Sequence, residues 1–157
     1  MFRLRRTAPA IGAPRPLWQD YIMRSTVDKV VVNFPDAPPV TGDEDAGFEA
    51  VWSNDGLPAG VRTYGEQLVV FLGDAEAEVS SPAEATTLLR DVFADRTVAV
   101  AGFSGGALVK LYLAPADDIG AGLNSPAHVY QGALAQMIDD VQVRSWSGAL
   151  DRGGAEA

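Results

Sequence analysis

One stretch decides between two folds for this chain: VAVAGFSGGALVKLYL, residues 98–113. Side chains alternate in character along residues 98–102 and again along 107–113, which is the period of a β-strand. Between the two runs, Ser104-Gly105-Gly106 has the composition of a turn, and Pro115 ends the second run. The stretch therefore predicts a β-hairpin in which the serine and the glycines only turn the chain.

The same stretch contains the pattern G-x-S-x-G at residues 102–106. In a nucleophile elbow this pattern turns a strand sharply into a helix and exposes a serine hydroxyl. Residues 81–115, read as a helix, a strand, this motif and a following helix, resemble the corresponding part of an α/β-hydrolase. The resemblance implies a small serine hydrolase in which Ser104 is the nucleophile, and this is the alternative reading of the chain.

The chain order of that family is serine, acid, histidine. Asp117 or Asp118, followed by His128, satisfies the order. Only 24 positions separate Ser104 from His128, where the family places further strands and helices. No histidine precedes Ser104, which excludes the chymotrypsin-like order. A helix over residues 107–113 would favour the hydrolase, whereas a strand there would favour the hairpin.

The composition restricts the chemistry further. The chain has 157 residues, enough for one domain with a sizeable core. It has no cysteine, which excludes disulfides and thiolate ligands, and it has a single histidine. We therefore expect no metal site and no cofactor.

The charge is acidic and uneven. The formal net charge is −9, yet the first 24 residues carry five arginines against one aspartate. The remaining residues carry twenty acidic against seven basic side chains. Such a body repels nucleic acid and anionic membranes, so neither is an expected partner. A basic protein partner, or simply a well-solvated surface, fits the charge better.

The domain boundaries follow from composition. Residues 1–22 are basic and then rich in Ala, Pro and Gly, and we expect a disordered extension there. They lack the apolar core of a secretory signal, so a cytoplasmic location is expected. A single globular domain is predicted over residues 23–149, and residues 150–157 are expected to fray.

Short alternating segments predict most of the strands. Val27–Phe34 and Phe48–Ser53 both alternate, and two further runs, Val61–Tyr64 and Gln67–Leu72, flank Gly65-Glu66. A glycine at the first position of a two-residue loop is typical of a type II′ hairpin. Residues 141–146 alternate weakly and predict a last edge strand, which allows a homodimer through strand pairing there or at Val27–Phe34.

Two helices are marked by their N-termini. Ser81-Pro82-Ala83-Glu84 is a capping box, and the helix that it opens should run to about Asp95. Ser125-Pro126 opens the second, which should reach about Val141. The sequence therefore predicts an α+β fold: a mainly antiparallel sheet of about five to seven strands with two helices packed on one face.

The functional prediction favours binding over catalysis, because the chain lacks a convincing catalytic set. We expect a small, acidic, soluble protein that acts through protein–protein interaction, with a regulatory or inhibitor-like role. Trp146 is the candidate aromatic anchor. Asp43, Glu44 and Asp45 lack the other ligands of a calcium loop, so we do not expect them to bind calcium. They form the candidate acidic contact with a partner.

Overall fold

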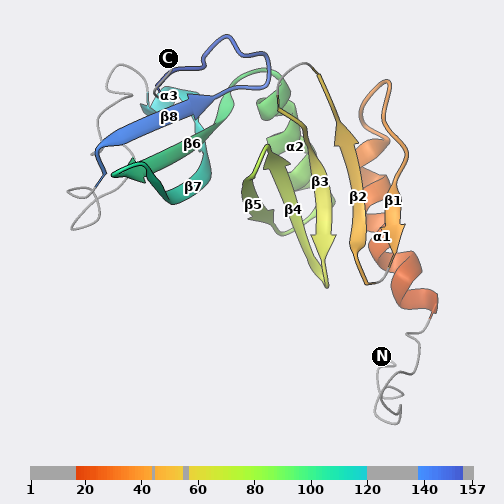
Figure 1. Ribbon diagram of the computed structural model, residues 1–157. Helices are drawn as coiled ribbons and strands as arrows, with labels where there is room; N and C mark the ends of the chain where they lie inside the picture. The colour runs from red at the N-terminus through yellow and green to blue at the C-terminus, as the bar shows by residue number, and fades with distance from the viewer. Residues whose placement is uncertain (1–16, 44, 55–56, 120–137, 154–157) are drawn as a thin grey trace, which may run out of the picture.

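The computed structural model describes residues 17–43, 45–54, 57–119 and 138–153. Figure 1 shows two antiparallel sheets joined through helix α2. The elements in chain order are α1 (Leu17–Val31), β1 (Thr41–Asp43), β2 (Gly47–Trp52), β3 (Ala59–Tyr64), β4 (Gln67–Leu72), β5 (Ala75–Val79), α2 (Pro82–Phe93), β6 (Thr97–Ser104), β7 (Ala107–Pro115), α3 (Ala116–Ile119) and β8 (Asp140–Arg144). The larger sheet has the order β1-β2-β3-β4-β5, and the smaller has the order β7-β6-β8.

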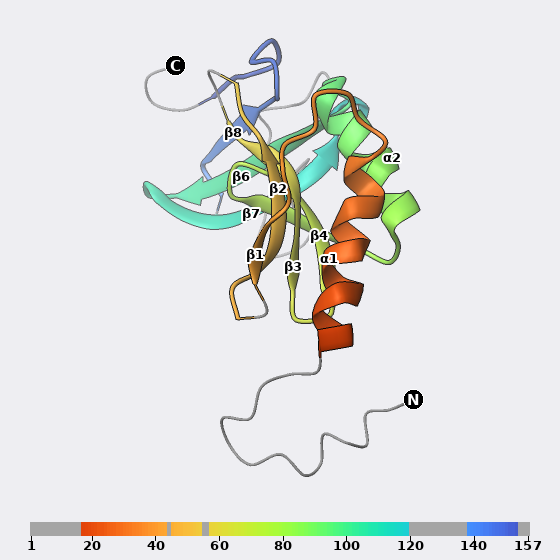
Figure 2. The same ribbon diagram turned by 90° about the vertical axis from the view of Figure 1, so that its right-hand side faces the viewer.

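The predicted α+β class with mainly antiparallel pairing is confirmed, although the strands are divided between two sheets. Helices α1 and α2 pack on the same face of the larger sheet (Figure 2). The β6–β7 hairpin extends on the opposite side of that sheet. None of the described helices is long and apolar enough to cross a bilayer.

The predicted strand over Val27–Phe34 is wrong, because this segment belongs to α1 as far as Val31. The reason is the spacing of its buried side chains: Val27, Val30 and Val31 are buried, at helical intervals of three and four. Val32, which a strand pattern would bury, is 76% exposed. A run of β-branched residues thus concealed a helical period, and α1 begins at Leu17, before the expected domain boundary.

The predicted N-cap of α2 is confirmed, but the return bond of the capping box goes to Ser80 instead of Ser81. The Ser81 hydroxyl accepts a hydrogen bond from the backbone N–H of Glu84 at 3.1 Å. The Glu84 carboxylate accepts from the backbone N–H and the hydroxyl of Ser80, at 2.8 and 2.7 Å. Leu89 and Val92 face the larger sheet and are fully buried. The helix ends at Phe93, close to the expected end.

The β3–β4 hairpin forms in the predicted register, with Tyr64 opposite Gln67. Gly65 has a φ of +60°, a conformation that suits glycine at the first loop position. Side chains such as Val61 and Val70 face the helices, and Arg62 lies on the helix-free face. In β4 the residues on both faces are buried from Leu68 to Leu72. The hydrophobic core of this part of the molecule therefore lies between the sheet and the two helices.

The C-terminal part differs in detail from expectation. The predicted helix from Ser125 falls mainly outside the described residues, and Val141, its expected end, is a buried residue of β8. Beyond Leu150, Arg152 pairs with Val143 through two backbone hydrogen bonds of 2.9 and 3.0 Å. The paired part of the chain therefore extends past the expected domain end at residue 149.

Candidate interaction surface

Residues 107–115 form strand β7, so the G-x-S-x-G motif lies in a hairpin. Ser104 is the last residue of β6 and pairs with Ala107, which leaves Gly105 and Gly106 as the two-residue loop. Their φ angles of +59° and +88° fit a type I′ turn, which needs positive φ at both positions. The hairpin prediction is confirmed, and the helix that a nucleophile elbow requires does not follow Ser104.

The candidate acids of a hydrolase lie far from this serine. Asp117 and Asp118 belong to α3, at the end of β7 opposite to Ser104. The nine residues of β7 separate the two positions by about 25 Å, at roughly 3.3 Å per strand residue. His128 lies outside the described residues. The described residues therefore do not bring together the groups that acyl transfer would need.

In the acidic loop, the side chain of Asp43 bonds to the backbone of the same loop. The Asp43 carboxylate accepts hydrogen bonds from the backbone N–H groups of Asp45 and Ala46, at 2.9 and 2.8 Å. This is an Asx-type turn, which closes the connection between β1 and β2. Glu44 lies outside the described residues. The described residues hold no cluster of three or more acidic or histidine side chains that would bind a metal.

Trp146 is half-buried in an aromatic cluster. Its ring lies 4.9 Å from that of Phe93, and Phe93 in turn contacts Trp52 and Phe34, all edge to face. The Trp146 carbonyl accepts a hydrogen bond from Asn54 at 2.7 Å. The contacts of Trp146 thus join the segment after β8 to α2 and to the connection that follows β2, which is a structural role.

A cleft of about 360 Å³ lies beside this cluster, between the β2–β3 connection and the segment after β8. Its charged side chains already have partners. Asp151 accepts from the backbone N–H of Ser145 at 2.7 Å, and Arg144 donates to the Val143 carbonyl at 3.0 Å. The cleft therefore offers little unsatisfied polar chemistry to a ligand.

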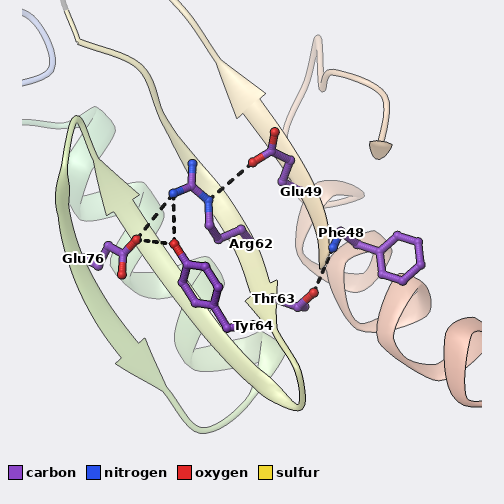
Figure 3. A network of polar contacts seen from close by, with 6 residues as sticks. All are labelled: Phe48, Glu49, Arg62, Thr63, Tyr64 and Glu76. Carbon is purple, nitrogen blue, oxygen red and sulfur yellow. Dashed lines mark hydrogen bonds and ion pairs between the residues drawn. The ribbon is translucent and has the colours of Figure 1, made fainter. Parts of the chain in front are cut away.

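The helix-free face of the larger sheet carries a polar network (Figure 3). Arg62 lies within 3.4 Å of both Glu49 and Glu76, and it donates to the Tyr64 hydroxyl at 3.2 Å. The Tyr64 hydroxyl donates to Glu76 at 2.6 Å. Burial alone would lower the pKa of Arg62, but Tyr64 and the two carboxylates raise it. Because the guanidinium lies 3.9 Å from the ring of Phe71, the network covers an apolar residue.

The sequence predicts the β6–β7 hairpin but does not indicate its tip as a candidate interaction surface. We define the hairpin tip as residues 103–110. Six consecutive residues in it, 105–110, are exposed, including Leu108 at 52% and Val109 at 38%. A register shift between Gly102 and Phe103 adds one residue to β7 here, which leaves two apolar side chains adjacent at the surface. The available signal was the apolar pair Leu108-Val109, two positions after the Gly105-Gly106 turn.

Two aspartates border the hairpin tip. Asp140 pairs with Phe103 across β6 and β8. Asp139 accepts a hydrogen bond from the backbone N–H of Gly105 at 2.9 Å, and its own N–H donates to the Phe103 carbonyl at 2.8 Å. The tip is therefore held against the start of β8. It presents an apolar centre with an acidic border.

No protein-family model, curated protein or solved structure matches the chain.

Proposed function

We propose that this chain is a binding protein that recognises a basic protein partner through the hairpin tip. The observation that carries the proposal is the exposed pair Leu108 and Val109 on β7, with Asp139 and Asp140 on the other side of β6 at the same hairpin tip. Apolar groups exposed together with a polar border are typical of protein contact sites. The acidic border and the net charge of −9 favour a basic partner and attract it over a distance.

The described residues also support binding over catalysis. Ser104 lies in a hairpin, and Asp117 lies at the far end of β7. Trp146 and Asp43, the contacts expected from the sequence, both make contacts within the chain. Among the described residues, the hairpin tip is where two exposed large apolar side chains, Leu108 and Val109, lie next to each other.

The test compares capture by three forms of the full-length protein: wild type, Leu108→Asp and the control Val32→Asp. Val32 is an exposed valine at the end of α1, far in sequence from the tip, so the control makes a matched change elsewhere. We expect wild type and Val32→Asp to retain the same basic protein. Leu108→Asp should weaken that retention by about tenfold or more, as for a central contact residue.

Salt provides the second arm of this test. Retention should fall steeply between about 0.05 and 0.5 M salt, because the border charges act through solvent. Equal capture by all three forms, or capture that salt does not affect, would show that the hairpin tip is not the binding surface.

A further inference from the structure

The segment after β8 forms a loop whose two ends are tied together. We define the C-terminal loop as residues 145–151. It lies between Val143 and Arg152, which pair through two backbone hydrogen bonds at the base of the loop. Compact surface loops whose ends meet in this way, known as Ω-loops, are frequently functional. The paired base makes β8 the anchor of the C-terminal loop.

Hydrogen bonds within the C-terminal loop hold its shape. The carboxylate of Asp151 accepts from the backbone N–H of Ser145 at 2.7 Å, and the Ser145 hydroxyl accepts from the N–H of Leu150 at 3.0 Å. The Ser147 hydroxyl accepts from the N–H of Ala149, also at 3.0 Å. Because these bonds join residues of the loop to one another, they persist when the loop moves as a whole.

Two side chains outside the C-terminal loop bond to it. Asn54 donates to the Trp146 carbonyl at 2.7 Å. The carboxylate of Asp95 accepts from both the hydroxyl and the backbone N–H of Ser147, the latter at 3.1 Å. The ring of Trp146 packs on that of Phe93. Both sets of hydrogen bonds are exposed to solvent, and such bonds open at a lower free energy than those of the core.

Asp95 occupies a backbone position that usually belongs to glycine. It follows the C-cap of α2 and has a φ of +61°. Its N–H donates to the Val92 carbonyl at 3.1 Å, and the N–H of Arg96 donates to the Asp91 carbonyl at 2.8 Å. These two bonds make a Schellman motif, which ends a helix without help from a side chain at this position. The bonds of its carboxylate to Ser147 therefore give aspartate a role here that glycine could not fill.

We infer that the C-terminal loop opens as a rigid unit about its base, and that Asp95 is the latch that keeps it closed. Opening separates the ring of Trp146 from Phe93 and uncovers one edge of the aromatic cluster. The loop also lines the cleft of about 360 Å³, so the same movement changes the width of that cleft. The inference concerns residues other than the hairpin tip and does not rest on the proposed function.

The experiment compares the full-length wild type with three variants. Asp95→Gly removes the carboxylate and keeps a residue that suits a positive φ. Asp95→Asn keeps one acceptor oxygen and tolerates the same backbone conformation. Asp36→Gly is the matched control, because exposed Asp36 is the other described non-glycine residue with a positive φ, at +56°. NMR gives amide hydrogen exchange at each residue and the nuclear Overhauser effects between the rings of Trp146 and Phe93.

In the wild type, we expect the N–H of Ser147 to have at least about tenfold less protection from exchange than those of Ser145 and Leu150, because opening breaks only the first of these bonds. Asp95→Gly should speed exchange at Ser147 by about tenfold or more and weaken the Overhauser effects between the two rings. Exchange at Ser145 and Leu150 should stay at the wild-type rate. Asp95→Asn should give an intermediate result, and Asp36→Gly should match the wild type.

Other results overturn the inference. If exchange at Ser145 and Leu150 accelerates together with Ser147 in Asp95→Gly, the loop unfolds instead of moving as a unit. If Asp95→Gly leaves both exchange and the ring contacts unchanged, the carboxylate is not a latch. The same acceleration in Asp36→Gly would assign the effect to the glycine backbone. Each of these outcomes leaves the proposed function untouched, because its test measures capture of a partner at the hairpin tip.

Discussion

Arg62 combines charge and packing in one side chain. It is 27% exposed, contacts two carboxylates and covers the ring of Phe71, which is almost fully buried on the helix-free face. A surface ion pair alone would contribute little to stability. The planar guanidinium adds stacking on the ring and contact of its aliphatic stem with the sheet.

We predict that Arg62→Ala lowers the free energy of unfolding by about 1–3 kcal/mol, because it exposes Phe71 and leaves Glu49 and Glu76 without their cation. Urea denaturation followed by circular dichroism measures the change. Arg62→Lys should restore only part of the loss, since an ammonium cannot stack as a guanidinium does. Complete restoration by lysine would show that charge, and not stacking, is what matters. Glu66→Ala, in the exposed β3–β4 turn, is the control and should change stability by less than about 0.5 kcal/mol.

Ser104 is predicted to be unreactive. It ends β6 in a hairpin and therefore lacks the strained strand-to-helix turn that activates an elbow serine. A fluorophosphonate probe should leave the wild-type protein unlabelled, as judged by intact mass, and Ser104→Ala should behave identically. Stoichiometric labelling that disappears in Ser104→Ala would restore the hydrolase hypothesis.

The start of α2 makes stability depend on acid pH. Hydrogen bonds from the backbone and side chain of Ser80 lower the pKa of Glu84 below its ordinary value of 4.5. Because this pKa is lower in the folded state, the ionised carboxylate stabilises the fold above about pH 4.5. That stabilisation is lost as the pH falls through the pKa of Glu84 in the folded protein. We predict that the difference in melting temperature between wild type and Glu84→Gln is largest near neutral pH and shrinks below pH 4.5.

Ser81→Ala provides the comparison for this element. It removes the hydroxyl that accepts from the Glu84 N–H and should cost about 0.5–2 kcal/mol at every pH. Thermal melts at several pH values between 3 and 7 distinguish the two variants. If the difference in melting temperature between wild type and Glu84→Gln does not vary with pH, ionisation of this carboxyl does not stabilise the helix.

Elements were predictable wherever local chemistry specifies them. The cap at Ser81, the hairpin at Gly65 and the turn at Gly105-Gly106 each depend on residues within a few positions. The strand prediction around Val27 was wrong because β-branched residues fit a strand locally, whereas burial against the sheet and α2 selects the helix. Tertiary context overrode local propensity there.

The candidate site was harder to predict for a related reason. The exposure of Leu108 depends on the projection of the hairpin from the body, and its acidic border depends on the pairing of β8 with β6. Neither fact is encoded in a short motif. Trp146 looked like a free anchor because its ring partner, Phe93, is more than fifty positions away.

At the scale of the whole molecule, the two sheets are held together partly by the segment that follows β8. Trp146 packs on Phe93 of α2, and Asn54 donates to its carbonyl. The next residue, Ser147, bonds to the carboxylate of Asp95 at the end of α2 through its hydroxyl and its backbone N–H. These contacts fix the smaller sheet, and with it the hairpin tip, relative to the helices.

We therefore predict that Trp146→Ala lowers the free energy of unfolding by about 2–3 kcal/mol, because it removes a half-buried ring from an edge-to-face cluster. Trp146→Phe should lose much less, since it keeps an aromatic ring against Phe93. Urea denaturation gives both values. Capture of the basic protein partner, measured where the variants remain folded, separates this structural role from a role in binding. A Trp146→Ala protein with unchanged stability but weakened binding would make Trp146 a partner contact, as its sequence position suggested.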